Sequence, residues 1–264
     1  MISIVTGYYN RKDLFYRTLK SITRSEYKDI ELIAVDDGSS PEHRIEDLVE
    51  EFPFLKIIRL EKEDKWYSNP CITFNIGIRA SKGNIIVLQN PECLHVHDVL
   101  TYVSQNVNDT NYITMSAYGV NKEINEKISQ NPDMILGIFN SLPQRPYAGY
   151  ESIGWYNHSK YRRVYYHFCS AITRSNMEKL NGFDERYAKG IGYDDDEIIA
   201  RISKLGLQLM INDNISVIHQ YHDTVSWNKP NADMLTERNR LILHNITFKE
   251  NKYSANFIKL WDGN

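Results

Sequence analysis

Short apolar runs alternate with segments whose apolar residues recur every three or four positions along most of the chain. An apolar run of about four to eight residues between turn residues is typical of a buried strand in a parallel sheet. Apolar residues at helical spacing predict amphipathic helices that cover such a sheet. The alternation therefore predicts an α/β fold with right-handed crossovers. We predict strands at residues 2–6, 30–35, 56–60, 84–88, 112–117, 164–172, 207–211 and 215–219.

Turn and capping residues mark the predicted helix ends. Asn10 and Asn69 are predicted N-caps, and Ser40 with Pro41 has the pattern of an N-cap followed by the first helical residue. Ser175 begins a capping box that a glutamate completes three residues later. The helical patterns run over residues 14–22, 45–52, 72–80, 96–103, 175–182, 194–205 and 233–250.

Residues 119–161 break this alternation. The segment is polar at first and then rich in proline, glycine and aromatic residues. A segment of this length without regular structure is usually a binding loop or disordered. Its aromatic residues favour a binding loop, because aromatic faces stack on bases and on the apolar faces of sugar rings.

Composition narrows the class of protein. The chain has 264 residues, of which 42% are hydrophobic and 25% are charged, as is ordinary for a soluble globular protein. Its net charge of −3 argues against a nucleic-acid partner. Three widely spaced cysteines indicate neither a disulfide framework nor a zinc site, which favours a reducing, cytoplasmic location. We expect no signal peptide and no transmembrane helix, since no apolar run reaches about 18 residues.

Two aspartates end the predicted strand at residues 30–35. Asp36 and Asp37 would lie at the carboxyl end of a parallel strand, where ligands bind in open α/β sheets. Their oxygens can accept hydrogen bonds from a base imide or from ribose hydroxyls. Gly38 allows the backbone turn that follows. The alternative is an acidic turn that only caps the next helix.

Asn90, Pro91 and Glu92 end another predicted strand. Glu92 is a candidate ligand for a divalent cation, because carboxylate, amide and water oxygens suit Mg²⁺ or Mn²⁺. The alternative is a turn in which Glu92 only caps the following helix. Later in the chain, His219 can ligate a metal through a ring nitrogen at the end of a strand, and His222 is the competing choice. Either histidine can equally be structural.

Four successive acids, Asp194 to Glu197, open a predicted helix. The positive end of the helix dipole favours acids at this place, which supports a purely structural interpretation. However, four like charges repel one another, and Gly190 and Gly192 let the backbone approach a ligand closely. A carboxylate held there can act as a general base toward a sugar hydroxyl.

Several of these stretches occur in the order known from one enzyme family. Over about residues 1–222 the chain resembles a family-2 glycosyltransferase with the GT-A fold. The order of the whole set is more specific than any one motif. The matching stretches are Thr6 to Arg11 (TGYYNR), Val35 to Ser39 (VDDGS), Asn75 to Gly77, Lys82 to Glu92, Asn181 to Arg186 (NGFDER), the pair of Asp194 and Asp195, and His219.

The chain departs from the family pattern at three places. Asn90 stands where the Asp-x-Asp motif has a carboxylate, which lowers the negative charge available to a cation. Asn181 replaces the first glycine of the Gly-Gly-Phe-Asp-Glu segment. The aromatic segment at residues 143–168 matches no family motif.

The resemblance implies transfer of a sugar from a nucleotide-sugar, with a UDP-sugar as first choice, to a hydroxyl of a glycan or other acceptor, as in polysaccharide biosynthesis. It implies inversion at the anomeric carbon, with Asp195 beside Asp194 as general base. Mn²⁺ or Mg²⁺ would neutralise the leaving diphosphate, held by Glu92 with Asn90 or His219. The implied nucleotide-sugar contacts are Thr6, Tyr8, Asn10, Asp36, Asp37, Asn75, Asn90 and Arg163, and the implied acceptor contacts are Trp155, Tyr156, His158 and Tyr193.

The resemblance also implies one GT-A domain over residues 1–264, with a Rossmann-like, mostly parallel sheet, helices on both faces and a smaller antiparallel acceptor-side part. Its nucleotide-sugar half spans 1–118, its acceptor and catalytic half 119–232, and a terminal helix 233–264. Peripheral membrane association and the oligomeric state stay open. One alternative is a catalytically inactive, glycosyltransferase-like binding or scaffold protein. Another is a sugar nucleotidyltransferase, disfavoured because residues 1–15 contain one glycine.

Overall fold

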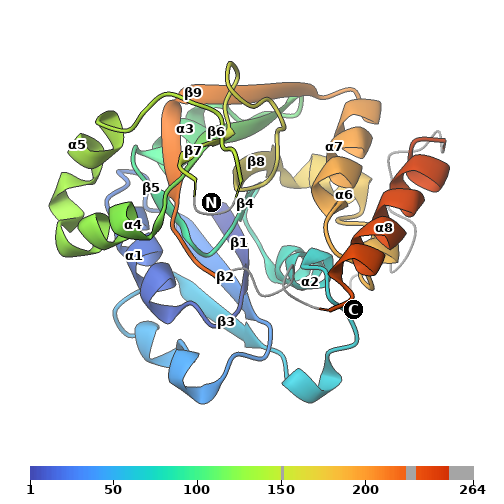
Figure 1. Cartoon of the computed structure of the whole chain (residues 1–264), viewed down its shortest axis with the longest axis horizontal. Coiled ribbons are helices and arrows are strands. Elements are labelled where there is room, and N and C mark those ends of the chain that lie inside the picture. The colour runs from blue at the N-terminus through green and yellow to red at the C-terminus, as the bar shows by residue number, and fades with distance from the viewer. Residues whose placement is uncertain (150–151, 224–229, 250–264) are drawn as a thin grey trace.

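Nine strands of the described residues form one mixed sheet at the centre of the molecule (Figure 1). The computed structural model describes residues 1–149, 152–223 and 230–249. The strands are β1 (Ile2–Tyr8), β2 (Ile30–Asp36), β3 (Leu55–Arg59), β4 (Ile85–Gln89), β5 (Cys93–His95), β6 (Asn111–Gly119), β7 (Gly154–Asn157), β8 (Cys169–Thr173) and β9 (Gln208–His219). Neighbours in the sheet follow the order β3-β2-β1-β4-β8-β6-β9-β5, and β7 pairs with β6.

The amino-terminal part of the sheet is parallel. β1 pairs with both β2 and β4, and β2 pairs with β3, always in the same direction. The register aligns Tyr8 at the end of β1 with Asp36 at the end of β2. The polar residues that follow these strands therefore lie along one edge of the sheet, as the sequence predicted.

The carboxyl-terminal part of the sheet mixes directions. β8 lies between β4 and β6 and is antiparallel to both strands. β9 is parallel to β6, whereas β5 is antiparallel to β9 and β7 is antiparallel to β6. The predicted fold class is confirmed as a mixed α/β sheet in which the antiparallel pairings belong to the second half of the chain.

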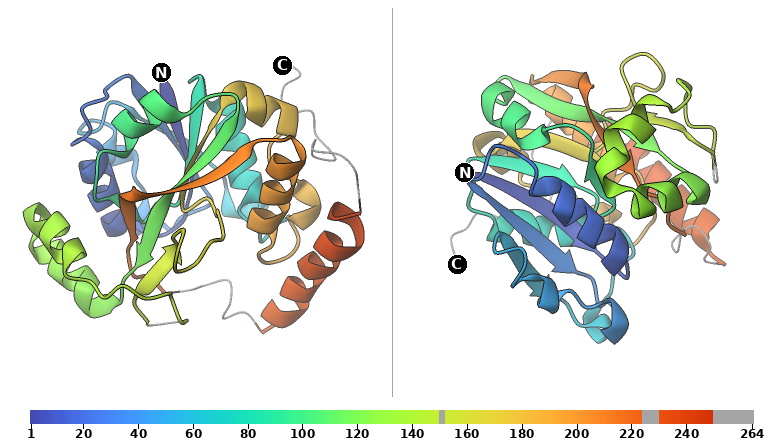
Figure 2. Two further views of the ribbon diagram at one scale, coloured as in Figure 1. Left: turned by 90° about the horizontal axis from the view of Figure 1, so that it is seen from above. Right: turned by 90° about the vertical axis from the view of Figure 1, so that its left-hand side faces the viewer.

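Helices cover both faces of this sheet (Figure 2). Because successive side chains of a strand point to opposite faces, Ile4 joins a buried cluster with residues of α1 and α3, and Val5 joins one with α2, α6 and α7. α4 and α5 pack in a third cluster beside β7. The helices are α1 (Lys12–Ile22), α2 (Cys71–Ala80), α3 (Val99–Asn106), α4 (Lys122–Gln130), α5 (Ile135–Asn140), α6 (Arg174–Leu180), α7 (Asp194–Lys204) and α8 (Ala232–Ile242).

The prediction of one helix that begins at Pro41 and continues through the pattern at residues 45–52 is wrong. Two single 3₁₀ turns, Pro41–His43 and Glu46–Leu48, take its place. Arg44 between them is extended, with φ −64° and ψ 145°, so a helix cannot continue through it. The apolar side chains that produced the helical pattern are buried all the same: Ile45, Leu48 and Phe52.

Residues 119–161 contain more regular structure than the sequence predicted. α4, α5 and β7 lie within this range, and only its remainder is irregular. The polar start of the segment forms an amphipathic helix, α4, whose Ile128 is fully buried. Asn121 caps that helix by accepting a hydrogen bond from the Ile124 N–H at 3.1 Å.

The late strands also differ from the prediction. The patterns at 207–211 and 215–219 belong to the single strand β9, whose pairing shifts register between Met115 and Ser116 of β6. This irregularity explains why the sequence read as two strands. The pattern at 164–172 becomes a strand only from Cys169 onward.

The helix ends fall near the predicted places but use other residues. Arg11 occupies the N-cap position of α1 instead of Asn10, which has a positive φ of 49°. Pro70 occupies that of α2, while the Asn69 side chain accepts a hydrogen bond from the Cys71 N–H at 2.9 Å. α8 ends in a π-helical turn, and the last residues of the predicted terminal helix lie outside the described range. Among the described residues, no helix is long and apolar enough to cross a membrane.

Candidate active site

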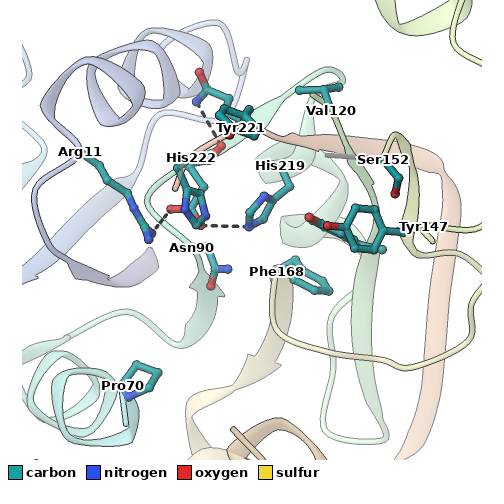
Figure 3. Close-up of a pocket in the computed structure, with 13 residues that line it drawn as sticks. Arg11, Pro70, Asn90, Val120, Tyr147, Ser152, Phe168, His219, Tyr221 and His222 are labelled. Carbon is teal, nitrogen blue, oxygen red and sulfur yellow. Dashed lines mark hydrogen bonds and ion pairs between the residues drawn. The ribbon is translucent and has the colours of Figure 1, made fainter. Parts of the chain in front are cut away.

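A pocket of about 370 Å³ opens beyond the carboxyl ends of β1, β4 and β9 (Figure 3). Arg11 enters it from the turn after β1, and Asn90 and Glu92 enter it from the turn after β4. His219 closes β9, and His222 follows three residues later. The pocket thus collects polar side chains that are far apart in the sequence, at the sheet edge where the sequence predicted a ligand site.

Glu92 is the centre of a charged group in this pocket, and its side chain is nearly fully buried. Arg11 Nη1 lies 2.8 Å from Glu92 Oε2. The Nε2 atoms of His219 and His222 lie 3.0 and 3.3 Å from Glu92 Oε1. These four residues form the Glu92 cluster. The choice between His219 and His222 that the sequence left open stays a prediction, because both rings contact the same oxygen.

The electrostatics of the Glu92 cluster keep its carboxylate charged. Burial alone would raise the pKa of Glu92, but the Arg11 guanidinium, and then His222 and His219, hold that pKa well below its usual range. Burial lowers the pKa of His219, although the bond to Glu92 opposes this effect. A charged carboxylate beside a neutral imidazole is the form in which both side chains bind metals.

The donor set of this cluster fits a divalent transition-metal ion. One ligand atom from each of Glu92, His219 and His222 can be chosen so that all three lie within 4.8 Å of one another. Imidazole nitrogens suit transition metals, whereas Mg²⁺ prefers oxygen ligands and octahedral geometry. The alternative role of Glu92 as a helix cap is wrong, because Asp98 caps α3 and accepts a hydrogen bond from the Thr101 N–H.

A second group of acids and a histidine lies at the start of α7. Asp195 Oδ1 lies 2.5 Å from His167 Nδ1 and also accepts a hydrogen bond from the His167 backbone N–H at 3.1 Å. Asp194 is buried and accepts a hydrogen bond from Asn69 Nδ2 at 2.9 Å. His167, Asp194 and Asp195 form the Asp195 cluster, in which one ligand atom of each residue lies within 4.8 Å of the others.

The charge balance of the Asp195 cluster raises pKa values. Burial, and then the neighbouring Asp195 carboxylate, raise the pKa of Asp194 to about 6. Burial alone would lower the pKa of His167, but Asp195 beside it raises that pKa above its ordinary value. Burial and the neighbouring carboxylate therefore favour the protonated form of Asp194, and Asp195 favours the protonated form of His167.

The other two acids of the run have partners of their own. Asp196 accepts a hydrogen bond from the Tyr166 hydroxyl at 2.8 Å. Glu197 is fully buried and forms an ion pair with Arg201 one helical turn later, at 2.5 Å. The run of four acids thus divides into two residues at the site, one beside it and one that stabilises α7.

The two aspartates after β2 differ in exposure. Asp36 is fully buried, where it accepts a hydrogen bond from the Ser39 N–H at 2.8 Å and pairs with Arg59 at 2.8 Å. Asp37 is partly exposed, accepts a hydrogen bond from the Tyr67 hydroxyl at 2.5 Å and forms an ion pair with Lys65. Asp36 shapes the turn, and Asp37 is the carboxylate that a ligand can reach.

Residues 67–70 connect Asp37, the Asp195 cluster and the pocket. Tyr67 donates to Asp37, Asn69 donates to Asp194, and Pro70 lines the pocket. Four consecutive residues therefore touch all three groups. This segment brings together acids that the sequence places more than 150 positions apart, from residue 37 to residue 194.

Residues 166–168 make a second connection. Tyr166 contacts Asp196, His167 contacts Asp195, and Phe168 lines the pocket, where its ring lies 5.7 Å from that of His219. Residues 166–168 therefore contact the acids at the start of α7 and also line the pocket that holds the Glu92 cluster.

Several predicted nucleotide-site residues have their side chains engaged within the protein. The Tyr8 hydroxyl donates to the His43 carbonyl at 2.6 Å inside the protein. Asn10 Oδ1 accepts the Ser40 N–H at 2.9 Å, which ties the turn after β1 to the turn after β2. Thr6 is buried within β1. Tyr8 and Asn10 thus hold the turns that follow β1 and β2.

Asn75 and Arg163 also lie away from the pocket. Asn75 is buried, donates to the Phe183 carbonyl at 2.9 Å and accepts from the Phe183 N–H at 2.8 Å, so it joins α2 to the turn before α7. Arg163 is exposed and donates to the Ser159 carbonyl at 3.2 Å. By contrast Asn90 lines the pocket, as expected.

Of the predicted acceptor residues, some line the pocket and others pack elsewhere. Trp155 is 3% exposed in the third cluster, donates to Gln144 and packs 4.4 Å from the ring of His158, so both rings belong to the interior of this part of the chain. Tyr156 lines the pocket and stacks on Phe168 at 5.2 Å. Tyr193 takes a left-handed conformation, with φ 65°, directly before the acids of α7.

The sequence did not single out two important side chains. Arg11 belongs to the TGYYNR stretch, but nothing in the stretch shows that its guanidinium reaches Glu92, 81 positions away. His167 precedes β8 and has no motif of its own, so only its contact with Asp195 reveals it.

Comparisons with known proteins show the family of the chain. The description "Glycosyl transferase family 2" matches residues 3–180, and the chain belongs to that family. A second description, "N-terminal domain of galactosyltransferase", matches residues 155–223. The chain is 33% identical over 88 residues to a chondroitin synthase from Escherichia coli, a match that covers 33% of this chain and 12% of the synthase.

Solved structures share the fold. S. aureus TarS 1-349 in complex with UDP-GlcNAc superposes with a TM-score of 0.64 at 13% identity, over 98% of this chain and 68% of that chain. GalNAc-T7 with UDP, GalNAc and Mn²⁺ also gives a TM-score of 0.64, at 15% identity, over 95% of this chain and 48% of that chain. These likenesses confirm the GT-A fold, and the chain is a glycosyltransferase by family.

Proposed function

We propose that the chain transfers a sugar from a nucleotide-diphosphate sugar, with a UDP-sugar as first candidate, to a hydroxyl of a glycan or other acceptor, with inversion. The observation that supports this proposal is the pair of connecting segments, residues 67–70 and 166–168, which contact Asp37 and the Asp195 cluster and line the pocket of the Glu92 cluster. A nucleotide, a diphosphate and an attacking hydroxyl need three such groups side by side.

The nucleotide would bind at Asp37. Asp37 is the reachable carboxylate after β2, and Lys65 lies 5.4 Å from the Tyr9 ring centre beside it. A carboxylate accepts hydrogen bonds from an imide or from ribose hydroxyls, and an aromatic face stacks on a base. UDP or a UDP-sugar is bound in the TarS and GalNAc-T7 structures, which makes uridine the first base to test.

The diphosphate would lie at the Glu92 cluster. Glu92, His219 and His222 would hold a divalent cation there, with Mn²⁺ preferred over Mg²⁺ because two of the three donors are imidazoles. When bound, such a cation neutralises the charge that develops on the departing diphosphate. Arg11 and Asn90 line the same pocket and can donate hydrogen bonds to phosphate oxygens.

Asp195 would take the proton of the acceptor hydroxyl. Its Oδ1 is occupied by His167, whereas Oδ2 has no hydrogen-bond partner among the described residues, and the side chain is 29% exposed. A carboxylate fixed through one oxygen presents the other to a substrate. Attack by the activated hydroxyl from the side opposite the leaving diphosphate inverts the anomeric carbon, with Tyr156 and Tyr193 on the acceptor side.

A donor panel tests this proposal. UDP-, GDP-, CDP- and dTDP-sugars are incubated with the protein and Mn²⁺, with and without mixed oligosaccharide acceptors, and the released nucleoside diphosphate is measured. We expect release from one nucleotide class, increased by acceptor and abolished in Asp195→Asn. Binding of a nucleotide without release from any donor would instead support the scaffold alternative, which Asn90 in place of a carboxylate favours.

A further inference from the structure

Arg11 and a cation compete for the same carboxylate. Arg11 Nη1 is 2.8 Å from Glu92 Oε2, while both histidines of the cluster use Oε1. No second acidic side chain contacts Arg11 in the described part of the chain, and Glu92 is buried. Because Asn90 adds no negative charge, Glu92 alone must balance whichever positive charge is present.

The position of Arg11 gives its side chain a second possible partner. Arg11 is the residue directly before α1, and its side chain is 26% exposed inside the pocket that would receive a diphosphate (Figure 3). A planar guanidinium binds carboxylates and phosphates through the same donor atoms. The amino end of α1 also favours a negative group at this place.

We propose that Arg11 and the divalent cation exchange at Glu92, so that Arg11 pairs with Glu92 when the cation is absent and is released to the donor's diphosphate when the cation binds. This inference rests on the proposed function for the identity of the anion, but not for the competition itself. Arg11 would then couple the two binding events, because a cation frees the arginine that the diphosphate needs.

The coupling has a thermodynamic signature. The cation alone binds weakly, since it must displace Arg11, and the nucleotide alone binds weakly, since it must draw Arg11 from Glu92. Each therefore strengthens the other by the same factor, as linkage requires. Part of that factor is direct contact between cation and diphosphate, and only the remainder depends on Arg11.

The test measures binding rather than catalysis. Mn²⁺ binding without nucleotide is followed by the electron paramagnetic resonance signal of the free ion, and UDP and GDP binding by calorimetry with and without Mn²⁺. We expect Arg11→Met to bind Mn²⁺ alone about tenfold more tightly than wild type, within the usual range of coupling effects. The factor by which Mn²⁺ improves nucleotide binding should fall at least about threefold in the same variant.

Three further variants sharpen the result. Lys12→Met removes the neighbouring positive charge, which pairs with the exposed Asp47, and should leave both measurements unchanged. Arg11→Lys keeps the positive charge but loses the fork of donors, so Mn²⁺ affinity should stay near wild type while the nucleotide gain falls. Adding Glu92→Gln to Arg11→Met should abolish the gain in Mn²⁺ affinity.

Equal Mn²⁺ affinity in wild type and Arg11→Met, or tighter binding in Lys12→Met as well, overturns the exchange. So does absence of Mn²⁺ binding in every variant. A donor panel that shows transfer alongside such results leaves the proposed function standing without the exchange. Tighter Mn²⁺ binding in Arg11→Met with no transfer from any donor supports the exchange and rejects the enzyme. If Arg11→Met unfolds at a lower temperature than wild type, both proteins are titrated well below that temperature, where the variant is folded.

Discussion

The Glu92 cluster and the Asp195 cluster use the same residue types in opposite proportion. Around Glu92, one carboxylate meets two histidines and an arginine. In the Asp195 cluster, one histidine meets two carboxylates. The first has an excess of groups that are positive or bind metals, and the second has an excess of negative charge. Residues 166–168 contact the second cluster and line the pocket that holds the first.

The two proportions give opposite proton behaviour. Arg11 and the histidines hold the pKa of Glu92 well below its usual range, so Glu92 stays charged despite burial. Burial and Asp195 raise the pKa of Asp194 to about 6, and Asp195 raises that of His167. A carboxylate held in its charged form suits cation binding, whereas an acid with a raised pKa suits proton transfer. The comparison teaches that the neighbours of an acid, more than its type, assign its task.

The largest expected effect is the loss of sugar transfer when the Asp195 cluster alone is changed. Asp195→Asn should reduce sugar transfer at least about 100-fold, the usual scale for loss of a general base, because the amide cannot accept the hydroxyl proton. UDP affinity in the presence of Mn²⁺ should stay near wild type. Initial rates with the best donor and calorimetric titration measure the two quantities. Unchanged transfer would reject Asp195 as the base.

A smaller effect is expected from the histidines of the Glu92 cluster. His219→Asn and His222→Asn should each weaken Mn²⁺ binding at least about tenfold, the lower end of what outer-shell changes cost at metal sites. His167→Asn serves as the matched control in the other cluster and should leave Mn²⁺ affinity unchanged. Loss of Mn²⁺ binding in His167→Asn would instead place the ion at the Asp195 cluster.

Variants of Asp37 and Asn75 compare a proposed ligand contact with a side chain that hydrogen-bonds the backbone inside the protein. Asp37→Ala should weaken UDP binding about tenfold, or about 1.4 kcal/mol. Asn75→Ala should leave UDP affinity of the folded protein unchanged but lower the free energy of unfolding by about 1–3 kcal/mol for each Phe183 backbone group left without its partner. Urea unfolding and calorimetry measure both variants. Weaker UDP binding in Asn75→Ala and unchanged UDP binding in Asp37→Ala would contradict both assignments.

The smallest effect concerns pH. The pKa of Asp194 is about 6 in the folded protein against 3.8 ordinarily, so the folded state binds the extra proton and stability falls as pH rises from about 4 to 6. Asp194→Asn removes this dependence. Between pH 5 and pH 7, wild type should therefore lose about 1 kcal/mol more unfolding free energy than the variant does. Parallel urea curves at the two pH values check this, and equal losses would contradict the raised pKa.

The sequence predicted the fold and the edge of the sheet that carries the site. Apolar runs that end in Asp36, Asp37 and Glu92 could be placed because strand ends of a parallel sheet meet at one edge. The sequence could not distinguish residues that contact a ligand from residues that bond the protein's own backbone. Asn10 and Asn75 are polar residues in family motifs, yet each satisfies backbone groups inside the protein.

Contacts between residues far apart in the chain could not be predicted from the sequence, for a physical reason. Whether Arg11 reaches Glu92, or His167 reaches Asp195, depends on how turns from distant strands pack and not on local spacing. The helix predicted at residues 45–52 failed in the same way, because burial of its apolar residues is satisfied equally well by two turns. Local pattern reports which side chains must be buried or polar, and packing decides which neighbours they meet.

Mn²⁺ titration of wild type, Glu92→Gln and Asp195→Asn, followed by the paramagnetic signal of the free ion, tests the division between the two clusters most directly. Both clusters hold three side chains close enough to bind an ion. We predict that Glu92→Gln loses Mn²⁺ binding and that Asp195→Asn binds as wild type does. Retained binding in Glu92→Gln together with loss in Asp195→Asn would contradict the account.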